Sequence, residues 1–169
     1  MKKSYLYILS VLILSITGCN NSDDRYLKQH LIGEWSGINQ VAMAMLEPDQ
    51  DITFISEYRF RESSEFSIIT FAEDLEGNFL GYRTLVKGKY NVNETSLLLF
   101  EAKSFETKED ELLKDLDQLK QMNSKHNPSE TFEIEFDEEF YFMTLKRSCP
   151  ENALCIKDPE LERKTVFIF

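Results

Sequence analysis

Two cysteines near the C-terminus are the residues whose types and spacing define a chemistry most directly. Cys149 and Cys155 bracket the short segment 150–154. An even pair this close in sequence is typical of a disulfide that closes a surface loop in an exported protein. Such a small loop is stabilised by about 2 kcal/mol. A metal site is the alternative, but His30 and His126 lie far away in sequence and share no ligand spacing with the two cysteines. The pattern favours a disulfide and predicts no metal.

The third cysteine, Cys19, follows a short apolar run. Lys2 and Lys3 precede the apolar residues 6–16, which are too few to span a bilayer, and the small Gly18 stands directly before Cys19. These features resemble the bacterial lipobox. The resemblance implies that residues 1–18 are a signal peptide and that acyl chains, palmitate among them, anchor the protein to a membrane through Cys19. Two or three such chains give essentially permanent attachment. An uncleaved N-terminal anchor helix is the alternative.

Residues 19–25 are predicted to form a lipidated tether, because residues 20–24 are polar and show no apolar periodicity. In enterobacterial lipoproteins, an aspartate directly after the lipidated cysteine retains the protein at the inner membrane. Asn20 occupies that place here. The resemblance therefore implies an outer-membrane protein whose domain faces the periplasm. The acidic residues Asp23 and Asp24 are also similar to surface-export signals of Bacteroidota lipoproteins, which makes the cell surface the alternative location.

The composition is strongly acidic. The chain has 19 basic and 30 acidic residues, and loss of Lys2 and Lys3 with the signal peptide leaves 17 against 30, a formal charge of −13 in place of −11. Nucleic acid is therefore not expected as a partner. An anionic membrane surface is expected to repel the domain as a whole. The charge serves solubility, or it serves to attract a basic protein partner.

Motifs that carry catalysis are missing. The sequence has no phosphate-binding glycine loop, no Gly-x-Ser-x-Gly and no His-Glu-x-x-His. The acidic residues Glu133, Glu135 and Asp137 follow from the alternation of a strand, and the segments 49–51 and 73–77 lack the full spacing of a calcium loop. We therefore expect neither an enzyme nor a cofactor.

Alternating apolar and polar residues predict eight strands. The segments that show this alternation, or that end in an apolar run, are 34–41, 51–61, 65–72, 80–91, 95–102, 131–137, 140–148 and 164–169. Short connections favour an antiparallel meander, and eight strands with one apolar face each can close into a small barrel. An open sheet or a two-sheet sandwich is the alternative.

Turn positions predict the register of the hairpins. A turn centred on Ser63 sets Phe60 against Phe66 and Tyr58 against Ile68. A tight turn near residues 138–139 gives the second hairpin three pairs: Phe136 with Tyr141, Ile134 with Met143, and Phe132 with Leu145. In the strand between these hairpins, the expected inward residues are Tyr82, Thr84, Val86, Gly88 and Tyr90.

One segment breaks the strand rhythm. In residues 107–123, Leu112, Leu116, Leu119 and Met122 recur at helical intervals between charged residues. This spacing predicts an amphipathic helix within an insertion at 103–130, placed before the last three strands. Its leucines are expected to pack against the barrel wall, and a partner-binding helix is the alternative. The whole of 26–169 is then one domain.

Three short motifs resemble bacterial lipocalin-like lipoproteins over residues 31–169. They are Gly33-Glu34-Trp35, Tyr58-Arg59-Phe60 and Gly88-Lys89-Tyr90, the last followed by three leucines at 97–99. The resemblance implies a lipocalin-like barrel in which Trp35 plugs one end and Gly33 meets a backbone requirement. It also implies that the interior or the mouth holds a small apolar ligand.

The loop at 41–51 is the expected lip of the barrel. Met43 and Met45 adapt to irregular surfaces, and Leu46 adds apolar area, so these three residues are the candidate contacts for a ligand or an envelope partner. Simple coverage of one barrel end is the alternative role for the same residues. The expected function is non-catalytic binding by a membrane-anchored lipoprotein. The alternative function is a periplasmic inhibitor or immunity protein directed against a basic hydrolase or toxin.

Overall fold

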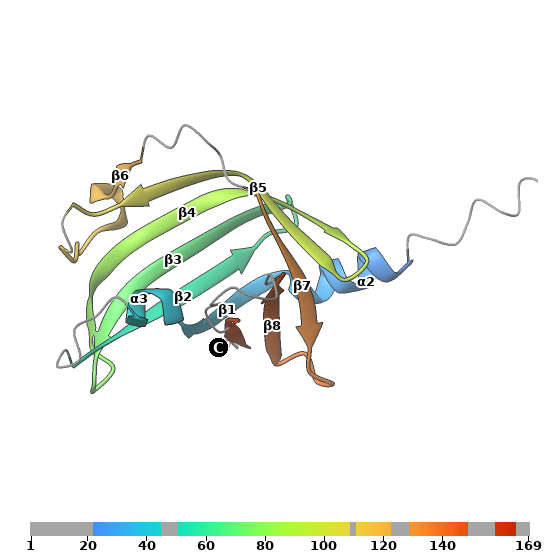
Figure 1. Cartoon of the computed structure of the whole chain (residues 1–169), viewed down its shortest axis with the longest axis horizontal. Helices are drawn as coiled ribbons and strands as arrows, with labels where there is room; N and C mark the ends of the chain where they lie inside the picture. The colour runs from blue at the N-terminus through green and yellow to red at the C-terminus, as the bar shows by residue number, and fades with distance from the viewer. Residues whose placement is uncertain (1–21, 45–50, 109–110, 123–128, 149–157, 165–169) are drawn as a thin grey trace, which may run out of the picture.

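The computed structural model describes residues 22–44, 51–108, 111–122, 129–148 and 158–164. Within them lie helices α2 (Ser22–Leu31) and α3 (Gln40–Ala44) and the 3-10 turn η1 (Leu116–Gln118). The strands are β1 (Gly33–Ile38), β2 (Ile52–Phe60), β3 (Glu65–Asp74), β4 (Phe79–Asn93), β5 (Ser96–Glu106), β6 (Lys120–Gln121), β7 (Glu130–Phe136), β8 (Phe142–Arg147) and β9 (Glu160–Arg163). Figure 1 shows their arrangement.

Eight of these strands close into an antiparallel barrel. Neighbours follow the order β1, β2, β3, β4, β5, β7, β8 and β9, and β9 pairs back with β1. The extra strand β6 pairs with the end of β5. Strands β1 to β5 form a long curved side, and the shorter β7 and β8 stand opposite (Figure 1). The prediction of a mainly β fold with an eight-stranded antiparallel meander barrel is confirmed.

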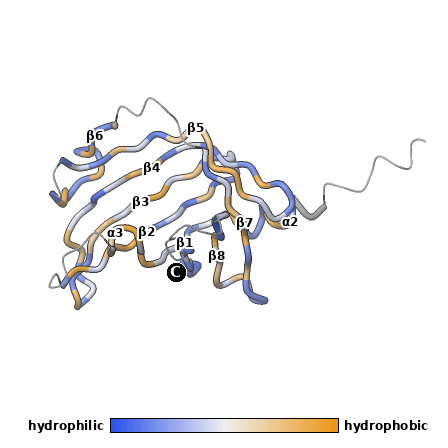
Figure 2. The backbone as a smooth tube through the Cα atoms, in the orientation of Figure 1, coloured by the Kyte–Doolittle hydropathy of each residue, from blue (hydrophilic) through white to orange (hydrophobic). Residues whose placement is uncertain are grey.

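The inward face of the barrel is the apolar face that the alternation predicts. Figure 2 shows apolar and polar stretches alternating along the long strands. The predicted pairs of the first hairpin are confirmed, because Phe60 pairs with Phe66 and Tyr58 with Ile68 in the β2–β3 ladder. The main core holds the buried residues Leu31, Trp35, Phe60, Phe66, Tyr90, Val92, Leu97, Leu99, Phe132, Ile134, Met143, Leu145 and Leu161.

The β7–β8 hairpin keeps its predicted inward face, but its predicted register is wrong by two residues. Phe136 pairs with Met143 and Ile134 with Leu145. The connection is longer than a tight turn, because the Asp137 amide bonds the Phe142 carbonyl and the Asp137 carboxylate accepts the Phe142 amide at 2.9 Å. Tyr141 therefore lies in the turn and is half exposed. A shift of two residues leaves every side chain on the same face.

Strand β4 departs from the predicted inward set at one residue. Thr84 and Val86 face inward opposite Thr70 and Ile68, but the ladder shifts between Thr70 and Phe71. Tyr82 packs instead with the outer cluster of Ile69, Leu85 and Leu119. A β-bulge adds one residue to a strand and so reverses the side-chain alternation beyond it.

The barrel closes where β1 meets β9. A Cβ atom at Gly37 would lie 2.3 Å from the Glu160 carbonyl oxygen, so the close approach of the two strands requires glycine there. The closing strand is β9 at 160–163, rather than the predicted strand at 164–169. Lys164 follows β9, and residues 165–169 lie outside the described residues.

The predicted amphipathic helix at 107–123 is wrong for the described part of that segment. Residues 107–108 and 111–122 contain a bridge from Leu113 to Tyr82, the 3-10 turn η1 and strand β6. The expected packing of its leucines is nevertheless found. Leu119 is buried on the outer face of β3 and β4 with Ile69 and Leu85, and Leu116 packs against the same cluster.

Helix α2 covers one end of the barrel and begins at Ser22, inside the segment expected to be tether. Leu31, at the end of α2, is fully buried, and Leu27 packs against the core. Trp35 is also fully buried, and its indole Nε1 donates to the Leu31 carbonyl at 2.9 Å. The prediction that Trp35 fills one barrel end is confirmed. We call this end the closed end.

Candidate functional site

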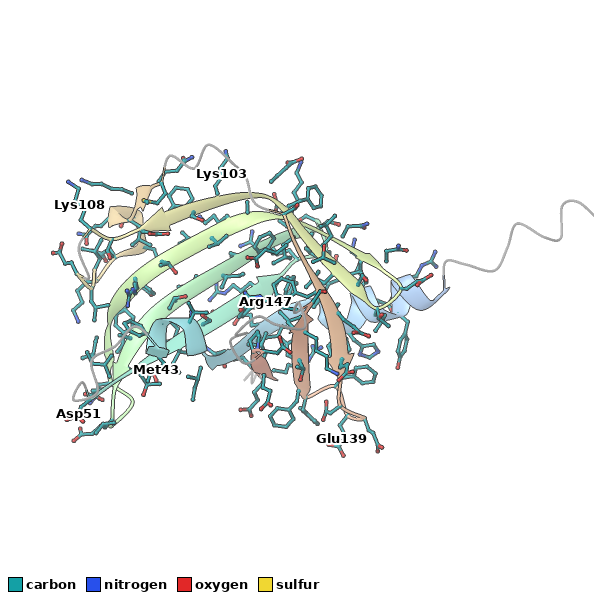
Figure 3. The ribbon with its side chains drawn as sticks, viewed as in Figure 1. Met43, Asp51, Lys103, Lys108, Glu139 and Arg147 are labelled. Atoms are coloured by element: carbon teal, nitrogen blue, oxygen red, sulfur yellow. The ribbon has the colours of Figure 1, made fainter. Side chains whose placement is uncertain are left out.

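The opposite end of the barrel contains a cavity of about 560 Å³. Every barrel strand contributes to its lining, together with Asn39 and the α3 residues Val41 and Ala42. We call this space the barrel cavity and this end the open end. In Figure 3, Met43 lies on α3, and Arg147 lies between α3 and β7.

The part of the barrel cavity nearest the closed end is apolar. Tyr58, Ile68, Val86 and Leu161 line it, and all four also belong to the main core or pack against it. The core beneath them is filled by aromatic and aliphatic side chains. A ligand in the barrel cavity would therefore rest on a packed apolar floor.

One wall of the barrel cavity is a hydrogen-bonded cluster of uncharged side chains. Ser56 and Thr70 are buried, and their hydroxyl oxygens lie 3.1 Å apart. The Asn39 amide nitrogen donates to Ser56 at 2.9 Å and to Thr70 at 3.4 Å. The Asn39 side-chain oxygen accepts the Ala42 amide at 2.9 Å, which caps the first turn of α3. One side chain thus ties the cavity wall to the helix at the opening.

Charged side chains line the rest of the barrel cavity. The Arg147 guanidinium lies 3.7 Å from the Glu130 carboxylate and 5.3 Å from the centre of the Phe132 ring. Arg83 also lines the cavity and lies 4.8 Å above the Phe54 ring. Glu106 lines it from the end of β5. The Arg147–Glu130 pair is partly exposed to solvent, so a polar group of a ligand can reach it.

Tyr58 provides a neutral hydroxyl at the cavity floor. Burial raises the pKa of Tyr58 to about 12, the nearby Arg147 opposes this rise, and Glu130 adds to it. The phenol therefore keeps its proton at neutral pH. It can both donate and accept a hydrogen bond.

Comparison with known proteins gives no relative. No family model, no curated protein and no solved structure matches this chain.

Of the three predicted lip residues, Met43 lies among the described residues. Met43 packs against the apolar cluster of Ala42, Phe54 and Ala72, and its sulfur accepts the Phe54 amide at 3.3 Å. Met43 thus fixes α3 to β2 at the open end. Met45 and Leu46 lie outside the described residues, as do Cys19, Cys149 and Cys155, so lipidation and the disulfide stay predictions.

The charged lining residues were not among the candidates from the sequence. Glu130 lies two residues before the inward Phe132, and Arg147 lies two residues after the inward Leu145. The sequence could have predicted these two residues, because a charged residue two positions from an inward residue of the same strand also faces the barrel or its mouth.

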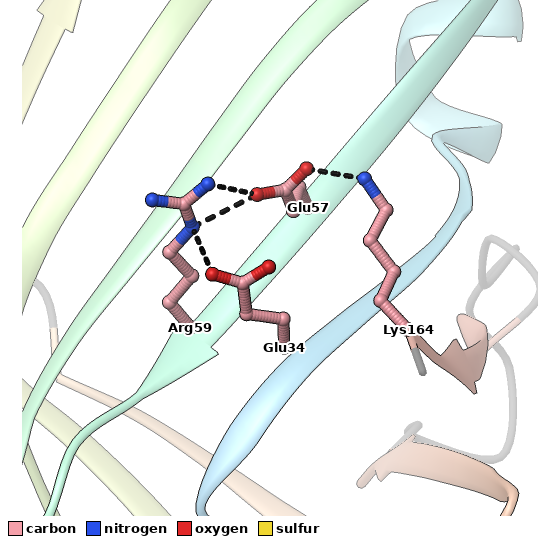
Figure 4. A network of polar contacts seen from close by, with 4 residues as sticks. All are labelled: Glu34, Glu57, Arg59 and Lys164. Atoms are coloured by element: carbon pink, nitrogen blue, oxygen red, sulfur yellow. Dashed lines mark hydrogen bonds and ion pairs between the residues drawn. The ribbon is translucent and has the colours of Figure 1, made fainter. Parts of the chain in front are cut away.

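A second charged network lies outside the barrel, on β1 and β2 (Figure 4). The Arg59 guanidinium lies 2.6 Å from Glu57 and 3.2 Å from Glu34, and the Lys164 ammonium lies 2.5 Å from Glu57. Glu57 alternates with the inward Ser56 and Tyr58, so it does not face the barrel cavity. We assign this network to stability.

The described residues contain neither a metal-binding cluster nor a membrane-spanning helix. No group of His, Cys, Asp and Glu side chains in this part of the chain is arranged to hold a metal ion. The helices found there are also too short or too polar to span a bilayer.

Proposed function

We propose that this protein is a membrane-anchored lipoprotein that binds a small, largely apolar molecule with a polar group inside its barrel. The barrel cavity is the observation that supports this proposal. A volume of about 560 Å³ lies within the usual range of small-molecule sites, and the lining joins an apolar floor to polar and charged walls. The role that we propose is binding without catalysis, as expected from the sequence.

The lining indicates how such a ligand would be oriented. Its apolar part would contact Ile68, Val86 and Leu161 at the floor. Its polar group would reach the Arg147–Glu130 pair or the Tyr58 hydroxyl. A purely apolar molecule would leave these groups without compensation for lost water, so the geometry favours an amphipathic ligand.

Filling the barrel cavity tests the proposal. Thr84 lines the cavity, whereas Thr131 is exposed on the outer side of β7. Thr84→Trp places an indole in the cavity, and Thr131→Trp makes the same chemical change outside it. The probe is N-phenyl-1-naphthylamine, an apolar fluorophore with one amine, whose emission rises when it leaves water.

We expect the wild-type protein and Thr131→Trp to bind the probe saturably with equal affinity, and Thr84→Trp to bind it at least about tenfold more weakly, a difference of about 1.4 kcal/mol. Thermal unfolding of each variant checks that the fold is retained. Equal affinity of the two folded variants, or no saturable binding by wild type, would contradict the proposal.

The location that we propose is the outer membrane, with the barrel on the periplasmic side and the cell surface as the alternative. It rests on the lipobox resemblance at Cys19. Cys19→Ser is expected to leave the barrel folded and to release it from the membrane fraction, because the lipid is the proposed attachment. Retention of the folded, cleaved variant in that fraction would contradict the anchor.

A second function, inhibition of a basic envelope protein, is supported by an acidic outer face. Glu133 and Glu135 on β7 alternate with inward residues, and Glu160 and Glu162 do the same on β9. Such a face attracts a basic partner, and that attraction weakens as salt rises. A stoichiometric basic protein recovered from envelope extracts, and lost on reversing these four charges, would favour this function over ligand binding.

A further inference from the structure

The outer face of β3, β4 and β5 carries a groove of about 370 Å³ whose lining includes four basic and two acidic side chains. We call it the basic groove. Its charged residues are Arg61, Lys87, Lys89 and Lys103, together with Glu65 and Glu101. Basic residues therefore exceed acidic ones here, although the chain as a whole is strongly acidic.

Two lysines of the basic groove face each other, and the described residues provide neither of them with a counter-ion. Lys87 on β4 pairs directly with Lys103 on β5 in the ladder. Like charges in this position destabilise a sheet. Glu101 is 2.6 Å from Lys89, and Glu65 accepts the Ser63 hydroxyl at 2.9 Å. Neither Lys87 nor Lys103 forms an ion pair with any of the described residues.

The backbone at the basic groove is also irregular. The β4–β5 ladder shifts between Lys87 and Lys89, and Glu101 has a positive φ of 51°. A Cβ atom at Gly88 would lie 2.7 Å from the Phe100 carbonyl oxygen, so the bulge requires glycine. The fold thus maintains a bulged, like-charged site in a β4–β5 ladder that is otherwise regular.

Opposite charge lies across the barrel. The acidic outer face of β7 and β9 carries Glu133, Glu135, Glu160 and Glu162. Strands β7 to β9 lie across the ring from β2 to β4. In Figure 3, Lys103 points away from the sheet at β5, on the opposite side of the molecule from Glu139 at the β7–β8 turn. The excess negative charge is therefore unevenly placed.

The basic groove begins near the point where the chain would leave the membrane. Helix α2 starts at Ser22, three residues after Cys19, and three residues span at most about 11 Å. Lys28 on α2 donates to the Ser64 hydroxyl in the β2–β3 turn at 2.7 Å, and Arg61 lies in the same turn. The tether and the part of α2 up to Lys28 together span at most about 20 Å, so this turn can reach the bilayer surface.

We propose that the basic groove rests on the anionic phospholipid headgroups of the membrane that carries the lipid anchor. This docking rests on the anchor of the proposed function. It places the basic groove, which lies beside the part of the outer face that segment 111–122 covers, against the bilayer and the acidic face toward the aqueous phase. Each lysine near an anionic surface favours contact, within about one Debye length.

Chemical labelling of lysines on the acylated protein tests the docking. The protein is inserted into vesicles of phosphatidylcholine alone, or of phosphatidylcholine mixed with phosphatidylglycerol, and is acetylated briefly. Mass spectrometry then measures each lysine. We expect acetylation of Lys87 and Lys103 to be about fivefold slower on the anionic vesicles. Lys108 and Lys146, which lie outside the basic groove, should react equally on both.

Two matched variants complete the test, with Lys89 acetylation as the measurement. Lys87→Gln/Lys103→Gln should abolish the protection of Lys89, whereas Lys108→Gln/Lys120→Gln, with the same change in net charge, should retain it. Equal acetylation of Lys87 and Lys103 on both vesicles overturns the docking while the anchor stands. So does saturable binding of inorganic phosphate in the groove without protection by anionic vesicles. A chain without acyl groups overturns both proposals.

Discussion

Glu57 is a buried carboxylate on the outside of the barrel, with 7% of its surface exposed. Burial alone would raise its pKa, but hydrogen bonds and charge from Lys164 and Arg59 together lower the pKa below its ordinary value of 4.5. The ionised form is therefore favoured in the folded state relative to the unfolded chain. Its stabilising effect is fully present above pH 4.5 and is lost as the pH falls through the lowered pKa.

Glu57→Gln is expected to reduce the free energy of unfolding by about 2 kcal/mol at pH 7, because two cations lose their shared partner. The difference between variant and wild type should shrink as the pH falls from about 4.5, where Glu57 of the unfolded chain becomes protonated, through the lowered pKa of the folded protein. Urea denaturation at pH 7 and at pH 3 measures both effects. Glu34→Gln, whose side chain is 37% exposed, is the control and should have a smaller effect. Equal effects of the two variants at both pH values would count against this role of Glu57.

Among the elements, α3 is held by few interactions, and Asn39 provides a central one. Its side-chain oxygen caps the helix, and its amide joins Ser56 and Thr70 in the cavity wall. The position of α3 and the shape of the barrel cavity are therefore coupled through this residue.

Asn39→Ala is expected to lower stability by about 1 kcal/mol and to speed amide hydrogen exchange in residues 40–44. Binding of N-phenyl-1-naphthylamine should weaken in parallel. Asn78→Ala removes hydrogen bonds to Asp74 in the β3–β4 turn, outside the cavity lining, and is the control. Unchanged exchange at 40–44 in Asn39→Ala would show that Asn39 does not hold the helix.

The segment 111–122 is the second element with a distinct role, because it covers apolar residues on the outside of the barrel. Leu119 is 7% exposed there, whereas Leu98 on β5 is 36% exposed. Leu119→Ala should lower the free energy of unfolding by about 3 kcal/mol, and Leu98→Ala by under about 1 kcal/mol. Chemical denaturation of both variants provides the measurement, and equal losses would contradict the covering role.

Some features of these elements could be predicted from the sequence and others could not. Strand faces were predictable, because alternation alone fixes them, and the Ser63 turn fixed the register of β2 and β3. The register of β7 and β8 was not predictable from the sequence, because the Asp137 side chain bonds the Phe142 amide and lengthens the turn. The helix prediction was wrong for a tertiary reason. Leu113 exchanges two backbone hydrogen bonds with Tyr82, and strand β6 pairs with β5, so the barrel bonds backbone groups that a helix would bond internally.

Along its axis the barrel has a packed half at the closed end and a half with a cavity at the open end. The chain has 13 phenylalanines, so the composition alone does not decide whether side chains fill the barrel or leave a cavity in it. In the structure, Phe60, Phe66 and Phe132 pack the closed half, while Ser56, Thr70 and Thr84 occupy the inward positions of the open half. Small polar side chains at those positions leave the barrel cavity. Composition could not reveal this, because it depends on which layer each residue enters.

The central claim is that the barrel cavity holds a small molecule in the native membrane. Native mass spectrometry of the protein, purified from its own membrane in mild detergent, tests it most directly. We predict a stoichiometric adduct beyond the acyl chains, present in the wild type and in Thr131→Trp and absent from Thr84→Trp. A wild-type protein that carries no adduct and gains none from extracts of that membrane would contradict the claim.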